Sequence, residues 1–557
     1  MPALRLAACI LHPQIKLSCY LFSCSMKSRH VVLRLLTAIL ASVSFSCLTL
    51  RAEPLPDNGS TQPSGGDASP PVDVPGSTAG APGNDARLGD SLGEGGAGGA
   101  GGATGAGGIR DAPIERPDAL ATEAGSEIRP RLSVSTIGLA ATLGTVVVDP
   151  RGLDCGQGCL SYQPGQQVTV TALPTPPALF AAWGGDCAGQ GHVCTITMMS
   201  DKAVAAHFRP NMNLMFVTSQ APLIPGRIGA NLDAADAACS AAAKAAFLGG
   251  TNWRAWLATS STTAAAHVGS STTGWIRVDG RPFAASSDDL IRGKVLHPPS
   301  LTERKTHRSD DLYSVLTGAQ ADGRVDSVHN CDDWTNTTGP IKAGNAFGTT
   351  DRWSSALVIA QSCGSPYPIY CFQNDPGMAS VTISSPPTNA RRAFVTATTW
   401  RPEGGIAGAD MRCQSEARTA ALPNPSNYRA LLATGVPATD SSRLNLGGQP
   451  WYRLDGVQLV ASAADLNAPL GNMMLTTLSV DANGQYVGSD EIWTGNGRAP
   501  GSALETLNCN NWSSNGDNDM GWWGYANILH SYMNRPLFWA NLPASCSAPR
   551  RLYCFEN

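Results

Sequence analysis

The sequence carries little charge for its length. Asp, Glu, Lys and Arg make up 15% of its 557 residues, and the formal net charge is −4. A chain with this balance has no bulk attraction for nucleic acid or for anionic membranes, so we expect no nucleic-acid partner. After the first 52 residues there is also no apolar stretch of the roughly 20 residues that a membrane-spanning helix needs. We therefore expect a mature chain that is soluble, or tethered to a membrane only at its N-terminus.

The common signatures of catalysis and of metal or phosphate binding are missing as well. The sequence contains no HExxH and no CxxC, and its glycine-rich tract, Gly93 to Gly108, lacks the flanking strand that a phosphate-binding loop needs. No cofactor is expected from these motifs. The length, by contrast, exceeds what one hydrophobic core usually organises, so we expect several domains.

Residues 1–52 have the pattern of an export signal rather than of a fold. From Met26, which is an alternative start, a basic segment precedes an apolar run, Leu35 to Phe45, that is short for a bilayer. Two processing sites compete: a weak lipobox before Cys47, whose thiol would carry a lipid, and a peptidase site after Ala52. We expect an extracellular or cell-surface protein, with an outer-membrane lipoprotein as one form of it.

Cysteine usage favours the same compartment. Four of the 16 cysteines lie at or before Cys47, and the other 12 form three sets of four, separated by cysteine-free stretches. Even sets in an exported chain are typical of disulfides. In the first set, Cys155 pairs with Cys159 and Cys187 with Cys194, since each pair brackets a glycine-rich turn; half of a metal site is the alternative for the first pair.

Residues 53–130 and 131–210 differ sharply in composition. The first stretch is rich in Gly and Pro and has hardly any aromatic or β-branched residues, so it predicts a disordered tether. The second alternates short apolar runs with Gly, Pro and Asp, which indicates a small antiparallel β domain. Its "WGGDC" around Trp183 and its last strand ending on Phe208 resemble the divergent internalin B-type bacterial repeat. That resemblance implies a spacer or adhesion-associated module rather than catalysis.

Residues 212–374 and 392–557, called repeat 1 and repeat 2 below, are two copies of one domain joined by a linker at 375–391. Their landmarks recur in the same order: "WRAWLATS" with "YRALLATG", "RVDG" with "RLDG", "VLTG" with "IWTG", "NCDDW" with "NCNNW", and a final "YCF" strand. So many landmarks in one order exclude coincidence. Each copy has four cysteines, which allow three pairings, and the sequence alone does not choose between them.

Both repeats resemble a family of bacterial secreted domains of unknown function that is related in fold to C-type lectins and endostatin. The motifs that carry the resemblance are "NC[DN][DN]W" and the cysteine before the terminal "YCF". It implies an α+β C-type-lectin-like fold whose terminal strands are neighbours, with nested disulfides, here Cys239–Cys371, Cys331–Cys363, Cys413–Cys554 and Cys509–Cys546.

The resemblance to C-type lectins makes calcium the candidate metal. Asp332 and Asp333 in repeat 1, and Asn510 and Asn511 in repeat 2, offer oxygen ligands in a turn. The alternative is that these side chains close the turn through hydrogen bonds to the backbone. The Glu-Pro-Asn and Gln-Pro-Asp triplets of sugar-binding lectins are absent, so a calcium site stays a candidate without its usual partner motif.

A catalytic site common to both repeats is not expected. Repeat 2 has one histidine, His530, and it has no clear counterpart among the histidines of repeat 1, namely His267, His297, His307 and His329. Asp236 and Asp410, three residues before the helix cysteine, fit helix capping and the helix dipole better than ligation. We predict no enzyme, with an extracellular hydrolase active in one copy, or a structural envelope protein, as alternatives.

Recognition is expected where the two copies differ, because loops on a rigid scaffold carry specificity. The differing stretches are those between "RVDG" and "VLTG", their counterpart in repeat 2, and the segment that contains Trp522, Trp523 and Tyr525. These aromatic side chains suit stacking on sugars or on a protein patch, although filling the core is an equal alternative. The sequence therefore predicts a binding or adhesion protein whose partner is an extracellular glycan or a surface protein.

Overall fold

The computed structural model describes residues 6–10, 18–22, 128–138, 143–307, 313–360, 362–434, 438–439, 443–467, 474–488, 490–495, 507–529, 538–539 and 542–557. The chain divides into two compact units, 1–117 and 118–557. In the first unit, β1 (Leu6–Ile10) pairs antiparallel with β2 (Ser18–Phe22). The processing sites and lipidation residue Cys47, and the tether before residue 128, lie outside the described residues.

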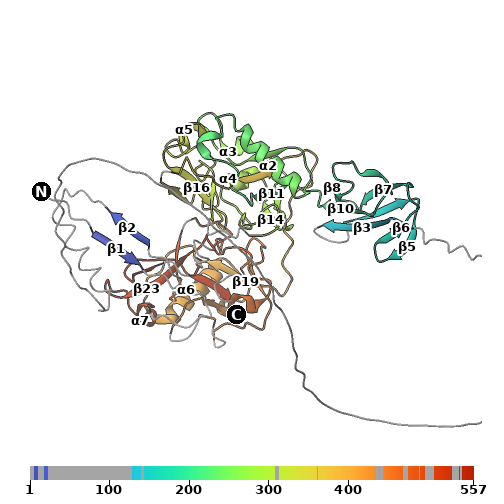
Figure 1. Ribbon diagram of the computed structural model, residues 1–557. Coiled ribbons are helices and arrows are strands. Elements are labelled where there is room, and N and C mark those ends of the chain that lie inside the picture. The colour runs from blue at the N-terminus through green and yellow to red at the C-terminus, as the bar shows by residue number, and fades with distance from the viewer. Residues whose placement is uncertain are drawn as a thin grey trace, which may run out of the picture. The chain divides into compact units, whose positions relative to one another are not determined.

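The second unit is multidomain and mostly β in its described part, with few helices and several separate sheets. This confirms the coarse fold class predicted above. No helix within the described ranges has the length and apolar character required to cross a membrane. Figure 1 shows residues 131–210 in cyan, repeat 1 in green to yellow and repeat 2 in orange to red.

Residues 131–210 form two sheets around one core and are called the β module below. One sheet has the order β5-β6-β3-β10-β8 and the other β4-β7-β9. The strands are β3 (Arg131–Gly138), β4 (Gly144–Asp149), β5 (Leu153–Gly156), β6 (Cys159–Ser161), β7 (Gln167–Pro174), β8 (Leu179–Gly185), β9 (Val193–Thr197) and β10 (Lys202–Arg209).

The β module is not purely antiparallel, which corrects the prediction. Its first and last long strands, β3 and β10, pair parallel over seven residue pairs, whereas the other pairs are antiparallel. Alternating apolar runs predict strands but carry no information on which strand is the neighbour. The buried face of β7 includes Val168 and Val170, and the Trp183 indole Nε1 donates to the Gly191 carbonyl at 2.7 Å.

Repeat 1 consists of a five-stranded sheet, a helix packed on one face, and a smaller three-stranded sheet. The orders are β12-β18-β11-β13-β14 and β15-β16-β17. Its strands are β11 (Leu214–Val217), β12 (Trp253–Ala255), β13 (Trp275–Arg277), β14 (Pro282–Ala284), β15 (Ser314–Leu316), β16 (Ile341–Asn345), β17 (Leu357–Ile359) and β18 (Tyr370–Gln373). Its helices are η1 (Pro225–Arg227), α2 (Asp233–Ala245), α3 (Ala264–Val268), α4 (Ser287–Ile291) and α5 (Cys331–Trp334).

Repeat 2 reproduces this plan, with sheets of order β20-β25-β19-β21 and β22-β23-β24. Its strands are β19 (Arg391–Val395), β20 (Tyr428–Ala430), β21 (Trp451–Arg453), β22 (Glu491–Trp493), β23 (Met520–Tyr525), β24 (Pro543–Ser545) and β25 (Tyr553–Glu556). Its helices are α6 (Gly405–Thr419), η2 (Pro425–Asn427), η3 (Ala463–Asn467) and α7 (Cys509–Trp512). In both repeats the terminal "YCF" strand lies antiparallel beside the first strand.

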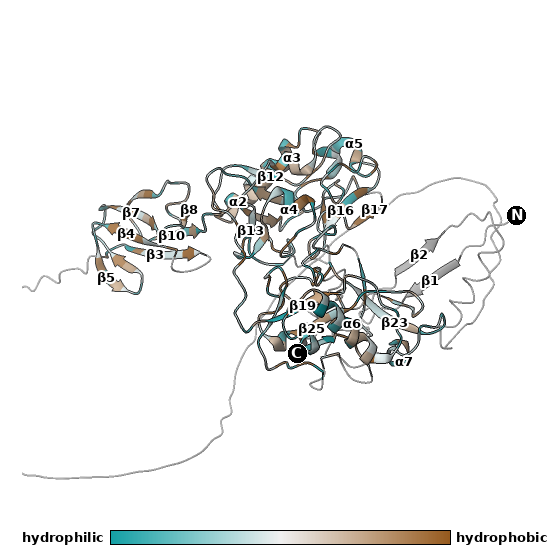
Figure 2. Ribbon diagram, turned by 180° about the vertical axis from the view of Figure 1, so that it is seen from behind, coloured by the Kyte–Doolittle hydropathy of each residue, from teal (hydrophilic) through white to brown (hydrophobic). Residues whose placement is uncertain are grey.

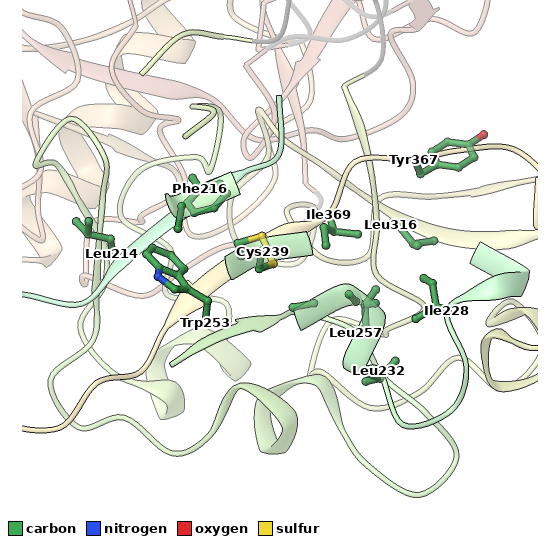
Figure 3. Close-up of a cluster of buried hydrophobic side chains, with 14 of the residues drawn as sticks. Leu214, Phe216, Ile228, Leu232, Cys239, Trp253, Leu257, Leu316, Tyr367 and Ile369 are labelled. Carbon is green, nitrogen blue, oxygen red and sulfur yellow. A yellow bond between two sulfur atoms is a disulfide. The ribbon is translucent and has the colours of Figure 1, made fainter. Parts of the chain in front are cut away.

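The "YCF" strand separates two layers of core. In repeat 1, Cys371 faces α2 together with Phe216 and Trp253, as Figure 3 shows around Cys239. Tyr370 and Phe372 point to the opposite layer. This alternation follows from the two-residue period of a strand. In Figure 2, β17, which consists of Leu, Val and Ile, has the colour of hydrophobic residues.

The described residues contain six disulfides, which confirms disulfide bonding as a property of the chain. They join Cys155 with Cys159, Cys187 with Cys194, Cys239 with Cys371, Cys331 with Cys363, Cys413 with Cys554, and Cys509 with Cys546. These are the pairs stated above, and those of the two repeats have the nested pattern that the resemblance implies. In each repeat the longer disulfide fastens the helix to the terminal strand, and the shorter one fastens the "NC[DN][DN]W" turn.

Candidate functional site

The three aromatic residues predicted for recognition do not share one face. All lie on β23, where successive side chains point to opposite sides. Trp523 is 7% exposed and packs in the core, with the Arg550 guanidinium 5.2 Å from its ring centroid. Tyr525 lies on the same side, 5.0 Å from Trp523. Trp522 points the other way, on the same face as exposed Met520, and both Trp522 and Tyr525 are partly exposed.

Trp522 belongs to an exposed apolar surface on the small sheet of repeat 2. Pro543 is its cross-strand partner on β24, and its backbone amide donates to the Leu507 carbonyl at 2.9 Å. Met520 lies two residues along β23, hence on the same face. Leu507 is 37% exposed and Met520 36%. We call this set, Leu507, Met520, Trp522 and Pro543, the β23 patch.

Repeat 1 lacks an aromatic residue at the equivalent place. Lys342 on β16 is the counterpart of Trp522, because the Thr317 amide donates to the Lys342 carbonyl as the Thr494 amide does to that of Trp522. The Lys342 amine lies 3.8 Å from the Asp326 carboxylate. The β23 patch is therefore a feature of repeat 2, and sequence reasoning missed Leu507, Met520 and Pro543. A comparison of the two copies strand by strand would have singled out Trp522.

The "NC[DN][DN]W" motif forms a left-handed turn in both repeats. In repeat 2, all four residues from Cys509 to Trp512 have φ between 52° and 66°, and in repeat 1 those from Cys331 to Trp334 have φ between 49° and 65°. Such a turn is strained for L-residues, and Asn and Asp adopt it most readily after Gly. The disulfide and the buried tryptophan hold it: the Trp512 indole donates to the Ala433 carbonyl at 2.7 Å.

Backbone conformation therefore explains the Asn and Asp residues that were candidate calcium ligands. Asp333 accepts hydrogen bonds from the Ser260 amide at 2.8 Å, from the Ser260 hydroxyl and from Asn330 at 2.7 Å. Asn511 accepts one from Asn508 at 3.0 Å. Asp332 and Asn510 are exposed. Within the described ranges, no group of three or more His, Cys, Asp or Glu side chains gathers as a metal site, and calcium at these two turns stays a prediction.

We expect the left-handed turn to respond differently to two small substitutions at exposed Asn510. Asn510→Ala should lower the free energy of unfolding of repeat 2 by about 1 kcal/mol, because alanine pays the full steric cost of a positive φ. Asn510→Gly should leave it about unchanged, since glycine adopts this conformation freely. Guanidinium unfolding followed by near-ultraviolet circular dichroism measures both. Equal effects of the two variants would contradict the conformational role.

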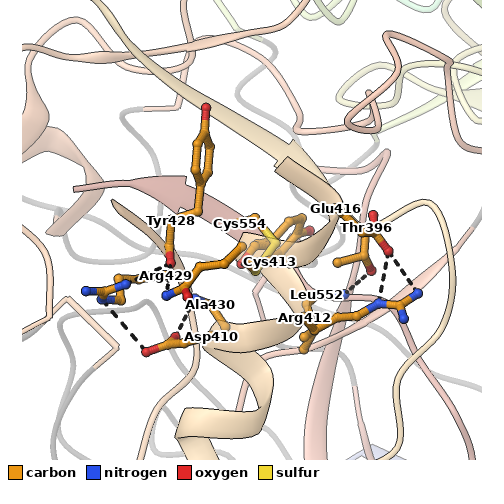
Figure 4. The surroundings of a disulfide bond; sticks show 12 residues. Thr396, Asp410, Arg412, Cys413, Glu416, Tyr428, Arg429, Ala430, Leu552 and Cys554 are labelled. Carbon is orange, nitrogen blue, oxygen red and sulfur yellow. Dashed lines mark hydrogen bonds and ion pairs between the residues drawn. A yellow bond between two sulfur atoms is a disulfide. The ribbon is translucent and has the colours of Figure 1, made fainter. Parts of the chain in front are cut away.

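Asp236 and Asp410 bind a strand rather than cap the helix, which corrects the capping part of the interpretation above, whereas Asp236 does lie in the first turn of α2, where it complements the helix dipole. The Asp236 carboxylate accepts from the Ala255 amide at 2.8 Å, and that of Asp410 from the Ala430 amide at the same distance. Figure 4 shows Asp410 pointing at Ala430 and Arg429, close to the Cys413–Cys554 disulfide. Asp236 and Asp410 occupy equivalent positions, because each lies three residues before the helix cysteine of its repeat.

The cation beside this carboxylate differs between the repeats. In repeat 1, Arg254 lies 2.5 Å and His267 3.0 Å from Asp236. Although burial of Asp236 opposes the shift, the hydrogen bonds from His267, Ala255 and Arg254 lower the pKa of its carboxyl. In repeat 2, Arg443 lies 2.9 Å from Asp410. His267 and Arg443 are both basic side chains beside the buried aspartate of their repeat. Compensation of the buried negative charge therefore accounts for both arrangements.

The stretches in which the two repeats differ most are buried against each other. Gly348 forms an antiparallel bridge with Ile528. The Thr349 amide donates to the Asn527 carbonyl at 2.8 Å, and the Leu529 amide donates to that of Phe347 at 3.1 Å. Gly348 lies three residues after β16, and Ile528 lies three residues after β23, so the two positions are equivalent. The two backbone hydrogen bonds that flank them are therefore related by a local two-fold axis.

A second pair of differing loops completes this junction. The Thr476 hydroxyl donates to the Leu296 carbonyl at 2.7 Å, and the Thr477 and Thr349 hydroxyls are 2.5 Å apart. All residues of 295–303 and 476–482 are buried. The loops expected to carry recognition are thus occupied by contacts between the repeats, and the difference in their sequences reflects a junction whose two sides are not identical.

Together these features define a disulfide-linked, mostly β protein with a duplicated domain. A family model described as the divergent InlB B-repeat domain matches residues 154–212, which confirms the repeat part of the resemblance stated for the β module. No curated protein matches the chain.

Proposed function

We propose that the protein is an exported, surface-associated binding or adhesion protein, in which the two repeats are C-type-lectin-like domains and the β module is a spacer. Four features support the lectin-like assignment: neighbouring terminal strands, a helix disulfide-linked to the terminal strand, a second small sheet, and the nested disulfide. The six disulfides fit an extracellular protein. The mature chain would be anchored, if at all, through Cys47.

The observation that carries the proposal is the β23 patch. It places a partly exposed indole and three apolar neighbours on a sheet that is held by the Cys509–Cys546 disulfide. The amide of Cys546 donates to the Asp519 carbonyl at 2.9 Å, so the sheet is fixed beside the patch. A rigid, partly exposed indole whose Nε1 is buried suits stacking on the apolar face of a sugar, and the ligand class is therefore an extracellular glycan or a glycosylated surface protein.

The alternative of a hydrolase draws its best support from the pair of Asp236 and His267. Arg443 takes the equivalent place beside Asp410 in repeat 2, where it cannot act as a general base. Charge compensation therefore explains this pair with fewer assumptions than catalysis.

Trp522→Ala is expected to weaken glycan binding by about tenfold, which corresponds to about 1.4 kcal/mol of lost stacking and apolar contact. Binding of the purified chain to a glycan array and to intact bacterial cells measures this, with and without EDTA. The matched control is Lys342→Ala, the same position in repeat 1, which should leave binding unchanged.

Three results would contradict this proposal. They are unchanged binding by Trp522→Ala, loss of binding by Lys342→Ala alone, and turnover of a substrate by the purified chain. Loss of binding in EDTA would instead indicate the calcium site predicted at the two turns.

A further inference from the structure

A cavity of about 250 Å³ lies where the β module meets repeat 1, away from the β23 patch. Its walls are mainly apolar and include Ile137, Phe208, Leu214, Phe247, Leu248 and Val278. Ile137 is 46% exposed at this cavity, whereas Leu214 and Val278 are buried. Aromatic stacking of His207 on Phe247, with ring centroids 4.4 Å apart, joins the two sides.

One wall of the cavity holds a buried positive charge that forms no ion pair with a described carboxylate, although Asp375 acts on it from farther away. Arg209 is 7% exposed, and its guanidinium donates to the Met212 carbonyl at 3.1 Å and lies near Pro210 and the Met378 sulfur. Its Nε is buried and makes no hydrogen bond within the described part of the chain, where no carboxylate forms an ion pair with it. Buried charges are normally paired, because desolvation costs several kcal/mol.

The other charged groups on the wall add positive potential. Lys305 belongs to an exposed loop and, among described residues, forms no ion pair. The Glu303 carboxylate is already bound by the amide and hydroxyl of Ser219 and lies 3.6 Å from Arg304. Burial, together with the nearby charge of Lys305, lowers the pKa of His207, and burial lowers that of Arg209 against the opposing effect of Asp375.

We infer that this cavity binds a small amphiphilic anion, with a short apolar body among Phe247, Leu214 and Val278 and one negative charge at Arg209. The anion would form an ion pair with Arg209 and accept a charge-assisted hydrogen bond from its guanidinium. The volume is at the small end of ligand cavities, which restricts the body to a short chain or one ring. A terminal carboxylate is the simplest such group.

Repeat 2 offers a matched control at the equivalent place. There Arg392 and Tyr452 are cross-strand partners, where repeat 1 has Leu214 and Ile276. They line a cavity of about 440 Å³ with Ser384, Ser385 and Thr388. That cavity has a cation, but its walls mix polar residues and Asp455 with apolar ones, so it should retain an apolar body less well.

The test is calorimetric titration of the full chain with octanoate, with 1-octanol, which lacks the charge, and with acetate, which lacks the body. We expect octanoate to bind and the other two to bind at least tenfold more weakly. Arg209→Gln should weaken octanoate binding at least tenfold, and Lys305→Asn, on the exposed loop, about two- to threefold. Arg392→Gln should leave it unchanged.

Absence of octanoate binding, equal affinity for octanol, or an effect of Arg392→Gln as large as that of Arg209→Gln would overturn the inference. If Arg209→Gln fails to fold, as judged by near-ultraviolet circular dichroism, unchanged affinity in Lys305→Asn would overturn it. The result is independent of glycan binding at the β23 patch, because Trp522→Ala should bind octanoate normally.

Discussion

Replacing Cys413 and Cys554 together by alanine is expected to lower the free energy of unfolding of repeat 2 by about 5 kcal/mol. The two residues are 141 positions apart, and in the chain-entropy model the stabilisation by a disulfide grows with the loop that it closes. Both cysteines are fully buried between α6 and β25, so the loss includes packing between the helix and the terminal strand. Such a loss is comparable with the entire stability of many domains.

Hydrogen exchange read by mass spectrometry locates this effect. Protection should fall along β19, β20 and β25 in repeat 2 and persist in β11, β12 and β18 of repeat 1, which keep their own disulfide. The control is removal of Cys155–Cys159, which closes a loop of separation 4 and should cost about 2 kcal/mol, confined to the β module. If the free energy of unfolding of repeat 2 fell by less than about 1 kcal/mol, Cys413–Cys554 would not be a major source of its stability.

The terminal strand could be predicted from the sequence, because the alternation of its residue types indicates which layer each side chain faces. Tyr370, Cys371 and Phe372 alternate, so a strand must send the cysteine to one layer and the two rings to the other. By the same rule, adjacent Trp522 and Trp523 on one strand must face opposite sides. Which of them is buried depends on the neighbouring strands, so only the structure could choose Trp522.

Other features depend on tertiary contacts that a linear pattern does not contain. The "NC[DN][DN]W" motif was recognised as a turn, but its left-handed backbone depends on the disulfide and on Trp512, both anchored far away in the chain. The sequence favours an interpretation of the junction loops as ligand-binding loops. Their sequences would differ between the two copies in either case, whether the loops bind a ligand or contact the other repeat. Burial of 295–303 distinguishes the two cases.

Within that junction, His297 should make the stability of the protein sensitive to mild acid. The imidazole is buried, its Nδ1 donates to the Pro282 carbonyl at 2.7 Å, and its Nε2 has no partner in the described part of the chain. Burial, followed by the positive charge of Arg277, lowers the pKa of His297 from 6.5 to about 3; Arg453 and Arg281 act in the same direction, and the Pro282 hydrogen bond opposes them.

The sign of the effect follows from proton linkage. The folded protein holds His297 neutral, whereas the unfolded chain binds a proton below about pH 6.5, so the stability is fully present above pH 6.5 and is lost as the pH falls toward 3. Between pH 7 and pH 5 the loss should be about 2 kcal/mol. The lowered pKa of the carboxyls of Asp279 and Asp455 affects stability only at more acidic pH, below their ordinary value of 3.8.

His297→Gln should remove most of this acid loss, since glutamine does not titrate and its amide can still donate to Pro282. Guanidinium unfolding at pH 7 and pH 5 measures the difference, and hydrogen exchange should place the acid-sensitive opening at 295–303 and 476–482, where the two repeats meet. The control His192→Gln changes an exposed histidine of the β module and should leave the acid response as it is. Equal acid sensitivity of the wild type and His297→Gln would contradict this prediction. It would show that the stability of the junction does not depend on a neutral His297.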